Sequence, residues 1–260
     1  MTPEEPTPSN DRAEFFKSLR NGVVLGLLVL AVVLPFRYFH PSRPASQPAA
    51  TVQAPASKAK PHVPRLADFG TEDASADARH VANWALHSGD NQGKAVVVVD
   101  KKAAKVYVFN PEGKLLAATP ALLGSAHGDH SVPGIGERPI PQILPEERTT
   151  PAGRFIAEPG RNANGEDIVW VDYNAAVSMH RVRPLVKAER RLERLASPTA
   201  DDNRISYGCI NLPVAFYEGV LSPAVQTTGA VIYVLPETSS PQEVFKSYDT
   251  TQPALLAQRG

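Results

Sequence analysis

The chain has 260 residues with 27 basic side chains, 27 acidic side chains, 25 prolines and a single cysteine. A formal net charge of zero argues against a nucleic-acid binder, because phosphate contacts need clustered Lys and Arg in excess. One cysteine cannot form an intramolecular disulfide or a multi-thiolate zinc or iron–sulfur site. The proline content is about double the average of roughly 5%, so part of the chain is expected to lie outside the core.

The N-terminal region contains an uncharged aliphatic run. Residues 21–36, NGVVLGLLVLAVVLPF, show no polar face at helical spacing, so a soluble helix is not expected there. The sequence predicts a cytoplasmic tail at 1–20 and a transmembrane anchor at 21–39. The run is slightly shorter than the roughly 20 apolar residues of a full span, so a cleavable signal peptide is the alternative. The long, acid-containing tail and the lack of a small-residue pair after the run favour an uncleaved anchor, with the remaining chain exported.

Two further segments have compositions that do not favour burial. Residues 40–65 are rich in proline and alanine and contain no Phe, Tyr or Trp. Such a segment cannot bury enough apolar surface to order itself, and its prolines favour an extended chain, so we expect a linker that acts as a spacer. Residues 239–260 are polar and predict a loosely attached C-terminal tail with a short helix around 242–248.

The folded part is expected between these segments, as a helical lead-in at 66–93 and a main domain at 94–238. A helix at 73–87 is predicted by its apolar stripe and its Asp or Ser cap. Short β-rich runs separated by turns predict strands at 94–100, 104–110, 114–118, 154–157, 168–173, 175–180 and 230–235. Helical patterns return at 184–196 and 213–218. Closely spaced short strands predict a mainly β fold, an antiparallel sandwich or open barrel with a few peripheral helices.

The only cysteine lies in the stretch RISYGCINLP, residues 204–213. Cysteine is among the most buried residue types, so Cys209 could serve packing alone. A nucleophilic cysteine needs a base that yields the thiolate and backbone donors that hold an oxyanion. Gly208 would let the backbone approach a substrate closely, and a turn at Cys209 would aim its amide into the site.

Several segments, taken in chain order, resemble the L,D-transpeptidase (YkuD-like) catalytic domain: 97–100 with its hairpin, 121–124 (ALLG), 150–155 (TPAGRF), 179–180 (MH) and 206–211 (SYGCIN). The family signature is an upstream histidine followed by Ser/Thr-His-Gly-Cys, a hydrophobic residue and Asn or Arg. The resemblance spans residues 94–236 and implies an L,D-transpeptidase-like β-sandwich. Its specificity is highest at the cysteine motif taken together with the Thr-Pro-x-Gly-x-Phe element.

The resemblance also implies the roles of individual residues. Cys209 would be the nucleophile, and His180 the base that activates it and later protonates the leaving amine. The backbone amides around Gly208 and Cys209 would form the oxyanion hole, while Ser206 and Asn211 would shape the loop. No cofactor and no metal ion are implied.

The chain departs from the family pattern at three points. Tyr207 stands where the family has a histidine, and a phenol with a pKa of about 10 cannot act as an acid or base near neutral pH. That histidine is normally a helper, so the nucleophile–base pair is still expected. The separation between His180 and Cys209 is longer than usual, with a basic helix around 187–194 filling the difference. Arg181 replaces the common glycine after the base.

The function implied by the resemblance is acyl transfer on peptidoglycan stem peptides, in the periplasm, by a single-pass inner-membrane protein. Cys209 would attack the carbonyl after a meso-diaminopimelate-type L-centre and expel D-alanine, and a stem amine would resolve the thioester. Water as the acceptor would make the protein a carboxypeptidase or endopeptidase, and a protein lysine would attach that protein to the wall. A catalytically impaired peptidoglycan-binding module is the alternative outside enzymes. Nucleic acid is not an expected partner, and the oligomeric state stays open.

Two other groups of residues have possible roles. Residues 127–130, HGDH, have metal-ligand types but lack a third partner at motif spacing, so a solvated loop is favoured over a metal site. The surrounding loop, 124–151, is long enough to be a lid or a substrate wall. The basic side chains of 181–194 are interpreted as a solvated helix face, or as a surface that attracts stem-peptide carboxylates in a salt-sensitive manner.

Overall fold

The computed structural model describes residues 62–251. The predicted tail, the predicted anchor and most of the predicted linker lie outside the described residues. Within 62–251, no helix has both the length and the apolar character needed to cross a membrane.

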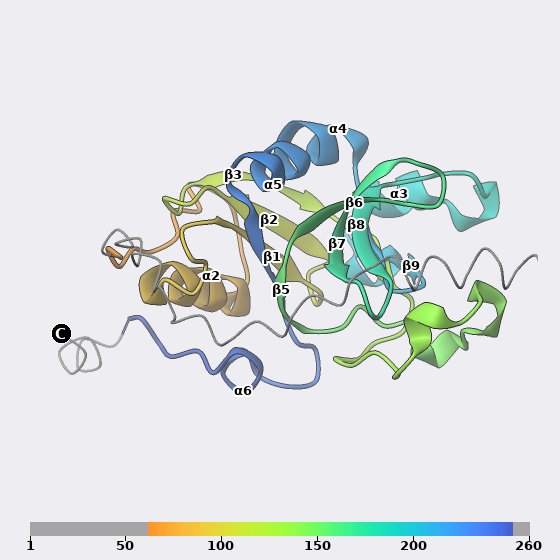
Figure 1. Ribbon diagram of the computed structural model, residues 1–260, viewed down its shortest axis with the longest axis horizontal. Helices are drawn as coiled ribbons and strands as arrows, with labels where there is room; N and C mark the ends of the chain where they lie inside the picture. Colours follow the sequence, from red (N-terminus) through yellow and green to blue (C-terminus); the bar gives the residue numbers. More distant parts are fainter. Residues whose placement is uncertain (1–61, 252–260) are drawn as a thin grey trace, which may run out of the picture. The chain divides into compact units, whose positions relative to one another are not determined.

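The larger sheet has five strands in the order β3-β2-β1-β11-β5 (Figure 1). These strands are β1 (Ala95–Asp100), β2 (Lys105–Phe109), β3 (Leu115–Pro120), β5 (Gly153–Ile156) and β11 (Ala230–Val234). The central strands β1 and β11 run parallel, with Val97 opposite Ile232. All other neighbours in this sheet run antiparallel.

A second sheet has four strands in the order β10-β8-β7-β6. They are β6 (Glu158–Arg161), β7 (Asp167–Asp172), β8 (Val177–Arg181) and β10 (Ile210–Leu212). β8 pairs antiparallel with β7 and parallel with β10. A short parallel pair, β4 (Leu123–Gly124) and β9 (Arg204–Ser206), lies beside β10, because Leu122 and Asn211 exchange backbone hydrogen bonds.

The larger sheet is buried on both faces. Val97 and Val99 of β1 enter the core that this sheet shares with the second sheet, whereas Val96 and Val98 face α2 (Ala76–Ser88) and α6 (Pro241–Phe245). Every residue of β1 is therefore buried. This explains why its sequence, AVVVVD, is a continuous apolar run without the alternation of a half-exposed strand.

Helices cover the outer face of the larger sheet. α2 begins after Ser75, whose hydroxyl accepts a hydrogen bond from the Ala78 amide, and ends at Gly89 in the left-handed region. Trp84 packs edge-on against Tyr233, with ring centroids 6.1 Å apart. Phe245 of α6 packs on the same tyrosine. The sequence predicted a loosely attached tail at 239–260. The first part of this segment, which contains α6, packs on the larger sheet instead.

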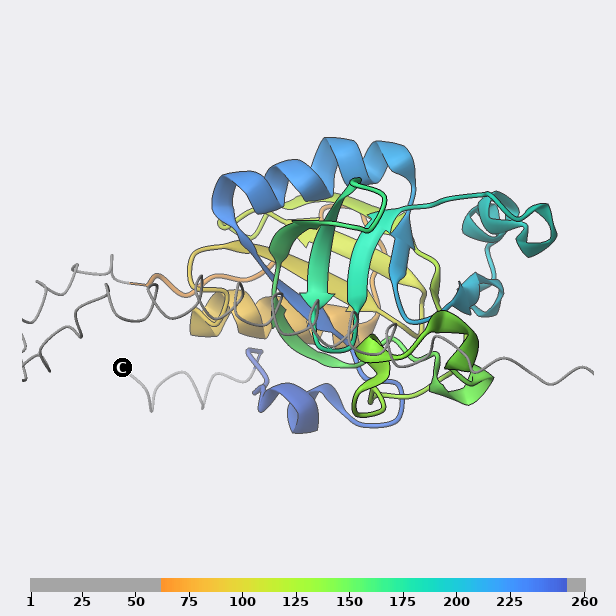
Figure 2. The same ribbon diagram turned by 45° about the vertical axis from the view of Figure 1, so that its right-hand side comes forward.

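A continuous helical run follows β10 and lies along one edge of both sheets (Figure 2). It consists of α4 (Val214–Phe216), the π-helical turn η6 (Tyr217–Leu221) and α5 (Ser222–Thr228). Phe216, Leu221 and Val225 fill the core between the sheets. The sequence predicted a helix over 213–218 alone, and the longer run forms because these residues give it an apolar face to bury.

Two long connections contain the remaining short helices. The loop after β4 holds η1 (Ile135–Glu137), η2 (Ile140–Gln142) and η3 (Pro145–Glu147), and the segment after β8 holds η4 (Lys187–Glu189), α3 (Arg191–Ala196) and η5 (Ala200–Asn203). The single helix predicted over 184–196 is wrong, because the chain breaks at Arg190, which has a φ of 49°. Leu185 and Leu192 are exposed and Leu195 is buried, so little apolar burial supports a longer helix.

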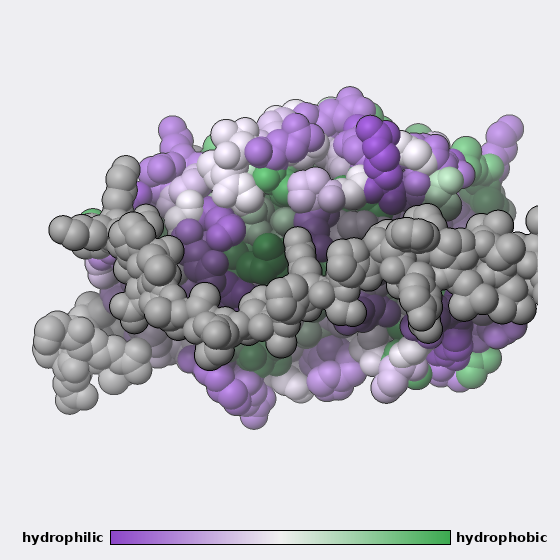
Figure 3. Space-filling view, viewed as in Figure 1, coloured by the Kyte–Doolittle hydropathy of each residue, from purple (hydrophilic) through white to green (hydrophobic). Residues whose placement is uncertain are grey.

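The predicted strands are present, but the sheets are mixed and not simply antiparallel. The parallel pairs β1–β11 and β8–β10 join segments that are far apart in the sequence. Local turn signals predict antiparallel hairpins and carry no information on such pairings. The result is a structure of mixed sheets with few helices. On the face drawn in Figure 3, hydrophilic and hydrophobic described residues are intermixed.

Candidate active site

The only cysteine lies at a junction between two strands. Cys209 is half-buried in the short turn that joins β9 to β10. Because β10 pairs in parallel with β8, with Asn211 opposite His180, this turn lies beside the start of β8. The sulfur atom of Cys209 is 3.5 Å from the carbonyl oxygen of Ala176 and 3.7 Å from the hydroxyl of Ser178.

The imidazole of His180 faces the thiol from β8. Side chains alternate along a strand, so His180 and Ser178 share one side while Met179 enters the core. The Nδ1 atom of His180 lies 2.8 Å from the carbonyl oxygen of Arg181. A carbonyl can only accept, so Nδ1 carries the proton and donates, which leaves Nε2 as the ring nitrogen free to interact with the Cys209 thiol.

The two side chains shift each other's pKa. Burial by itself raises the pKa of the Cys209 thiol, but the interactions with His180, together with the hydrogen bonds of Ser178, outweigh burial and bring the pKa below its ordinary value. Burial by itself lowers the pKa of His180, but the interactions with Cys209 and with the Arg181 carbonyl raise the pKa above its ordinary value. These opposite shifts favour a thiolate beside an imidazolium, which is the reactive form of a Cys–His pair.

The turn before Cys209 requires a glycine. Gly208 has a φ of +126°, and a β-carbon at this position would lie 2.7 Å from the carbonyl oxygen of Thr149. The hydroxyl of Thr150 donates to the carbonyl of Gly208 at 2.8 Å. The backbone of the loop after β4 therefore packs directly against the backbone of the nucleophile turn.

Ser206 and Asn211 hold the other side of the turn. The Ser206 hydroxyl donates to the Cys209 carbonyl at 2.6 Å and accepts from the Gly208 amide at 3.1 Å. The side-chain amide of Asn211 donates to the same Cys209 carbonyl at 3.3 Å. Among the described residues, no protein group accepts a hydrogen bond from the backbone amides of Tyr207 and Cys209, and the Cys209 amide is the one that belongs to the residue with the thiol.

Tyr207 lies outside the thiol–imidazole contact. Its side chain is 40% exposed, and the guanidinium of Arg148 lies over its ring at 4.2 Å from the centroid. The tyrosine thus contacts the loop after β4, where a stacked cation–π pair is worth about 0.5–1 kcal/mol.

The structure adds residues that the motif did not indicate. Ser178 contacts the sulfur, and its position two residues before the base, on the same side of a strand, is a signal that the sequence contained. Arg191 donates to the side-chain oxygen of Asn211 at 2.5 Å and to Glu189 at 2.6 Å. Nothing local in the sequence relates Arg191 to Asn211, which is twenty residues away.

A hollow lies beside the β7–β8 hairpin. It has a volume of about 480 Å³ and is lined by Gly134, Gly136, Glu137, Trp170, Tyr173, Asn174 and Ala176. Ala176 is the residue whose carbonyl contacts the sulfur. One wall comes from the loop after β4 and the other from the β7–β8 strands and hairpin, and Ala176 is the residue that this hollow shares with the surroundings of the sulfur.

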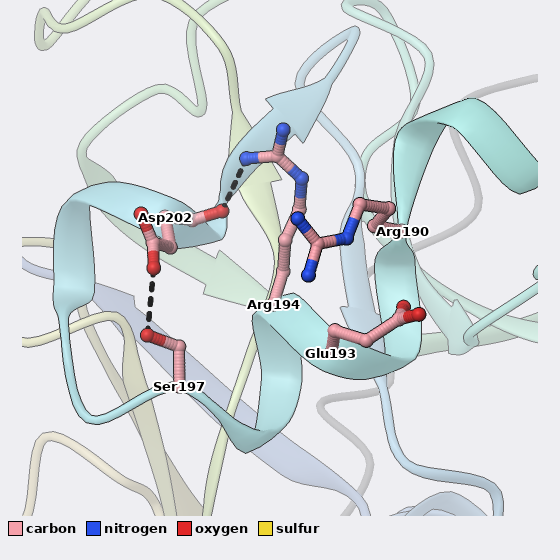
Figure 4. A pocket seen from close by; sticks show the side chains of 5 residues that line it. All are labelled: Arg190, Glu193, Arg194, Ser197 and Asp202. Carbon is pink, nitrogen blue, oxygen red and sulfur yellow. Dashed lines mark hydrogen bonds between the residues drawn. The ribbon is translucent and has the colours of Figure 1, made fainter.

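The basic segment after His180 is largely engaged within the protein. Arg181 pairs with Asp167 and Glu218. Arg194 donates to the carbonyl of Asp202, and Ser197 donates to the Asp202 carboxylate (Figure 4). These residues form with Arg190 and Glu193 a second hollow of about 290 Å³, in which two carboxylates accompany the arginines.

Within residues 127–130, Asp129 takes part in a buried ion pair and in buried hydrogen bonds that hold the fold together. The carboxylate of Asp129 is buried and accepts hydrogen bonds from Lys101 and from the backbone amides of Glu237, Thr238 and Ser239. His127 lies beside Glu237 at 3.2 Å. Within residues 62–251, no three His, Cys, Asp or Glu side chains are grouped to hold a metal ion.

The described residues thus bring Cys209, Ser178 and His180 together where β8 and β10 pair. No protein-family model matches the chain, and no curated protein matches it.

Solved structures give distant matches. An L,D-transpeptidase from Mycobacterium smegmatis is 19% identical with a TM-score of 0.33, and the match covers 54% of this chain and 58% of that one. The catalytic domain of an L,D-transpeptidase from E. faecium is 16% identical with a TM-score of 0.31, over 55% and 98% of the two chains. The helical cell shape determining protein Pgp2 from Campylobacter jejuni is 16% identical with a TM-score of 0.35, over 56% and 49%.

Proposed function

We propose that the protein is an L,D-transpeptidase-like acyltransferase that acts on peptidoglycan stem peptides through a thioester at Cys209. The observation that supports this most is that the β8–β10 pairing sets His180 opposite Asn211, two residues after Cys209, so that the imidazole interacts with the thiol and lowers its pKa. The motif resemblance of 150–155 and 206–211 supplies the substrate class. The hollow beside Ala176 offers room for an extended peptide.

In the proposed mechanism the Cys209 thiolate attacks the carbonyl that follows the L-centre of a diaminopimelate-type residue. The Cys209 amide donates to the oxyanion. The carbon–nitrogen bond breaks as the His180 imidazolium gives its proton to the amine of the leaving D-alanine. An acceptor amine then gives a proton back to His180, attacks the thioester and restores the thiol–imidazole pair.

The acceptor distinguishes three related activities. A stem amine gives a cross-link, water gives hydrolysis, and a protein lysine gives attachment of that protein to the wall. A peptidoglycan-binding module without turnover is the other candidate, suggested by Tyr207 at the helper position. The enzyme is favoured by the placement of Cys209, Ser178 and His180 around one point of the β8–β10 pair, with the thiol pKa lowered, because perturbed groups gathered in this way are typical of functional sites.

We also propose that residues 21–39 anchor the protein in the inner membrane, with the folded part in the periplasm. This rests on the uncharged aliphatic run and on the proline-rich 40–65 segment. Sequencing the N-terminus of the mature protein tests the proposal, because a mature chain that begins after residue 40 would show a cleaved signal peptide.

Intact-mass analysis of the full chain after exposure to a carbapenem tests the enzymatic proposal. We expect one covalent adduct on the native protein, none on Cys209→Ala, and a much slower adduct on His180→Gln. An undiminished adduct on Cys209→Ala contradicts the mechanism. A native protein that forms no adduct, yet sediments with purified cell-wall sacculi, supports the binding module.

A further inference from the structure

The two peptide groups that flank Cys209 are held by different side chains. The peptide after it, through the Cys209 carbonyl, is bound by Ser206 and Asn211. The peptide before it, through the Gly208 carbonyl, is bound by Thr150 alone among the described side chains. This second peptide carries the Cys209 amide, which is the proposed oxyanion donor.

Peptide geometry links Thr150 to that amide. In a planar trans peptide the carbonyl and the N–H point in opposite directions. A hydrogen bond that draws the Gly208 carbonyl towards Thr150 therefore turns the Cys209 amide away from Thr150. The direction of the oxyanion donor is set by a residue that does not itself approach the substrate.

The hydroxyl of Thr150 has a defined orientation. It accepts a hydrogen bond from the Gly124 amide at 2.9 Å, so its own proton is available for the Gly208 carbonyl at 2.8 Å. Both contacts are buried, and Thr150 has 0% exposure. Water cannot replace either partner there, so the hydroxyl is the only donor that can hold the Gly208 carbonyl in this place.

The backbone of Thr150 is fixed as well. Its carbonyl accepts from the buried ammonium of Lys101 at 2.9 Å, and that ammonium also contacts Asp129 at 3.0 Å. Pro151 follows, which confines Thr150 to an extended conformation, and branching at Cβ restricts its side-chain rotamer. The donor is thus pre-organised before any substrate binds.

We propose that Thr150 is a positioning residue that orients the Cys209 amide for oxyanion binding. The proposal rests on the proposed acyl-transfer function. Under this proposal, two properties of the site have different origins. The reactivity of the thiol comes from His180, and the stabilisation of a tetrahedral intermediate depends on Thr150.

Two reactions of the same thiol test this separation. Alkylation by iodoacetamide needs the thiolate but passes through no oxyanion, whereas acylation by a carbapenem needs both. For Thr150→Val in the full chain, we expect acylation to slow by about tenfold or more, since loss of an oxyanion-hole donor typically costs 10²–10³. We expect alkylation to stay within about twofold of the native rate.

Two further variants serve as controls. Thr150→Ser keeps the hydroxyl and should restore most of the acylation rate. Thr149→Val removes the hydroxyl of the neighbouring residue, which donates to the backbone carbonyl of His130 at 2.7 Å. This variant should leave the acylation and alkylation rates near native. Thermal melting of every variant shows whether the fold is kept.

The outcomes are distinct. Equal losses of alkylation and acylation in Thr150→Val, or a Thr150→Ser variant as slow in acylation as Thr150→Val, would overturn the positioning role and indicate general disruption of the turn. Acylation at the native rate in Thr150→Val also overturns it. A native protein that is alkylated but never acylated refutes the proposed function, and the positioning role with it.

Discussion

Two effects of opposite sign act on the Cys209 thiol, and their balance sets its reactivity. Burial disfavours the thiolate, and His180 favours it. Because the imidazole is also held by the Arg181 carbonyl, it cannot turn away from the sulfur without losing a hydrogen bond. The reactive pair is therefore ordered before any substrate arrives.

Replacing His180 by Gln should raise the pKa of the thiol. Without the imidazolium, burial is opposed only by the hydrogen bonds of Ser178, so the pKa should rise above its value in the native protein. We expect the alkylation rate of native Cys209 to reach its half-maximum below the ordinary thiol pKa of about 8.5, and that of the variant to reach it at higher pH. Rates of iodoacetamide labelling across a pH series measure this. Superimposable profiles would show that His180 does not activate the thiol.

Gly208 is the residue of the turn that tolerates substitution least. An added methyl group would meet the Thr149 carbonyl at 2.7 Å, at a φ of +126°. We expect Gly208→Ala to lower the free energy of unfolding by about 1–3 kcal/mol and to slow acylation. Urea denaturation measures the first effect. Gly165 also has a positive φ, but a β-carbon added there would have no neighbour within 4 Å. Gly165→Ala therefore measures the conformational strain without the clash.

At the scale of elements, a buried ion cluster ties the loop after β4 to the larger sheet. The Lys101 ammonium, at the end of β1, contacts the Asp129 carboxylate and the carbonyls of Gly128 and Thr150. Glu237, just after β11, lies 3.5 Å from Lys101 and pairs with Arg204 at the start of β9. The loop that carries Thr150 is thereby fixed to three strands.

Lys101→Met should destabilise the fold strongly. The substitution removes the Lys101 ammonium that pairs with the buried Asp129 carboxylate. Breaking a buried ion pair typically lowers the free energy of unfolding by roughly 3–5 kcal/mol. The neighbouring Lys102 has a side chain that is 52% exposed and pairs with Asp77 at the surface. Lys102→Met is the matched control and should cost less than about 1 kcal/mol. Equal denaturation midpoints for the two variants would contradict the role of the cluster.

At the scale of the whole molecule, the proposed base, His180, and the proposed nucleophile, Cys209, are far apart in the sequence and lie on neighbouring strands. β8 and β10 are neighbours, so the 182–203 segment leaves the sheet after His180 and returns just before Cys209. In Figures 1 and 2 this segment and the loop after β4 project from the same end of the two sheets. The inserted helix therefore adds a wall near the site without separating the reacting pair.

The anchor prediction belongs to the same scale. If residues 21–39 hold the protein in the membrane, the full chain should sediment with the membrane fraction and be released by detergent but not by salt. A chain that lacks residues 1–39 should be soluble and should keep its thiol reactivity, because the described fold begins later. A full-length chain recovered in the soluble fraction would contradict the anchor.

The sequence alone predicted most strands, because short β-rich runs bounded by turns depend on local composition. It also identified Cys209, His180 and Gly208 as candidate site residues, because a single cysteine in a recognisable motif is a local signal. The helix at 184–196 was predicted incorrectly, since its apparent apolar stripe finds almost no core to cover.

Tertiary structure alone decided the parallel pairings, the contact between Thr150 and the nucleophile turn, and the hydrogen bond from Arg191 to Asn211. Each of these joins residues that are distant along the chain, and no local pattern encodes such a distance. Local propensity and composition determine which segments are strands and which residues can react. Burial in the shared core determines how those segments pair, and the parallel pairing of β8 with β10 decides which side chains meet at the thiol.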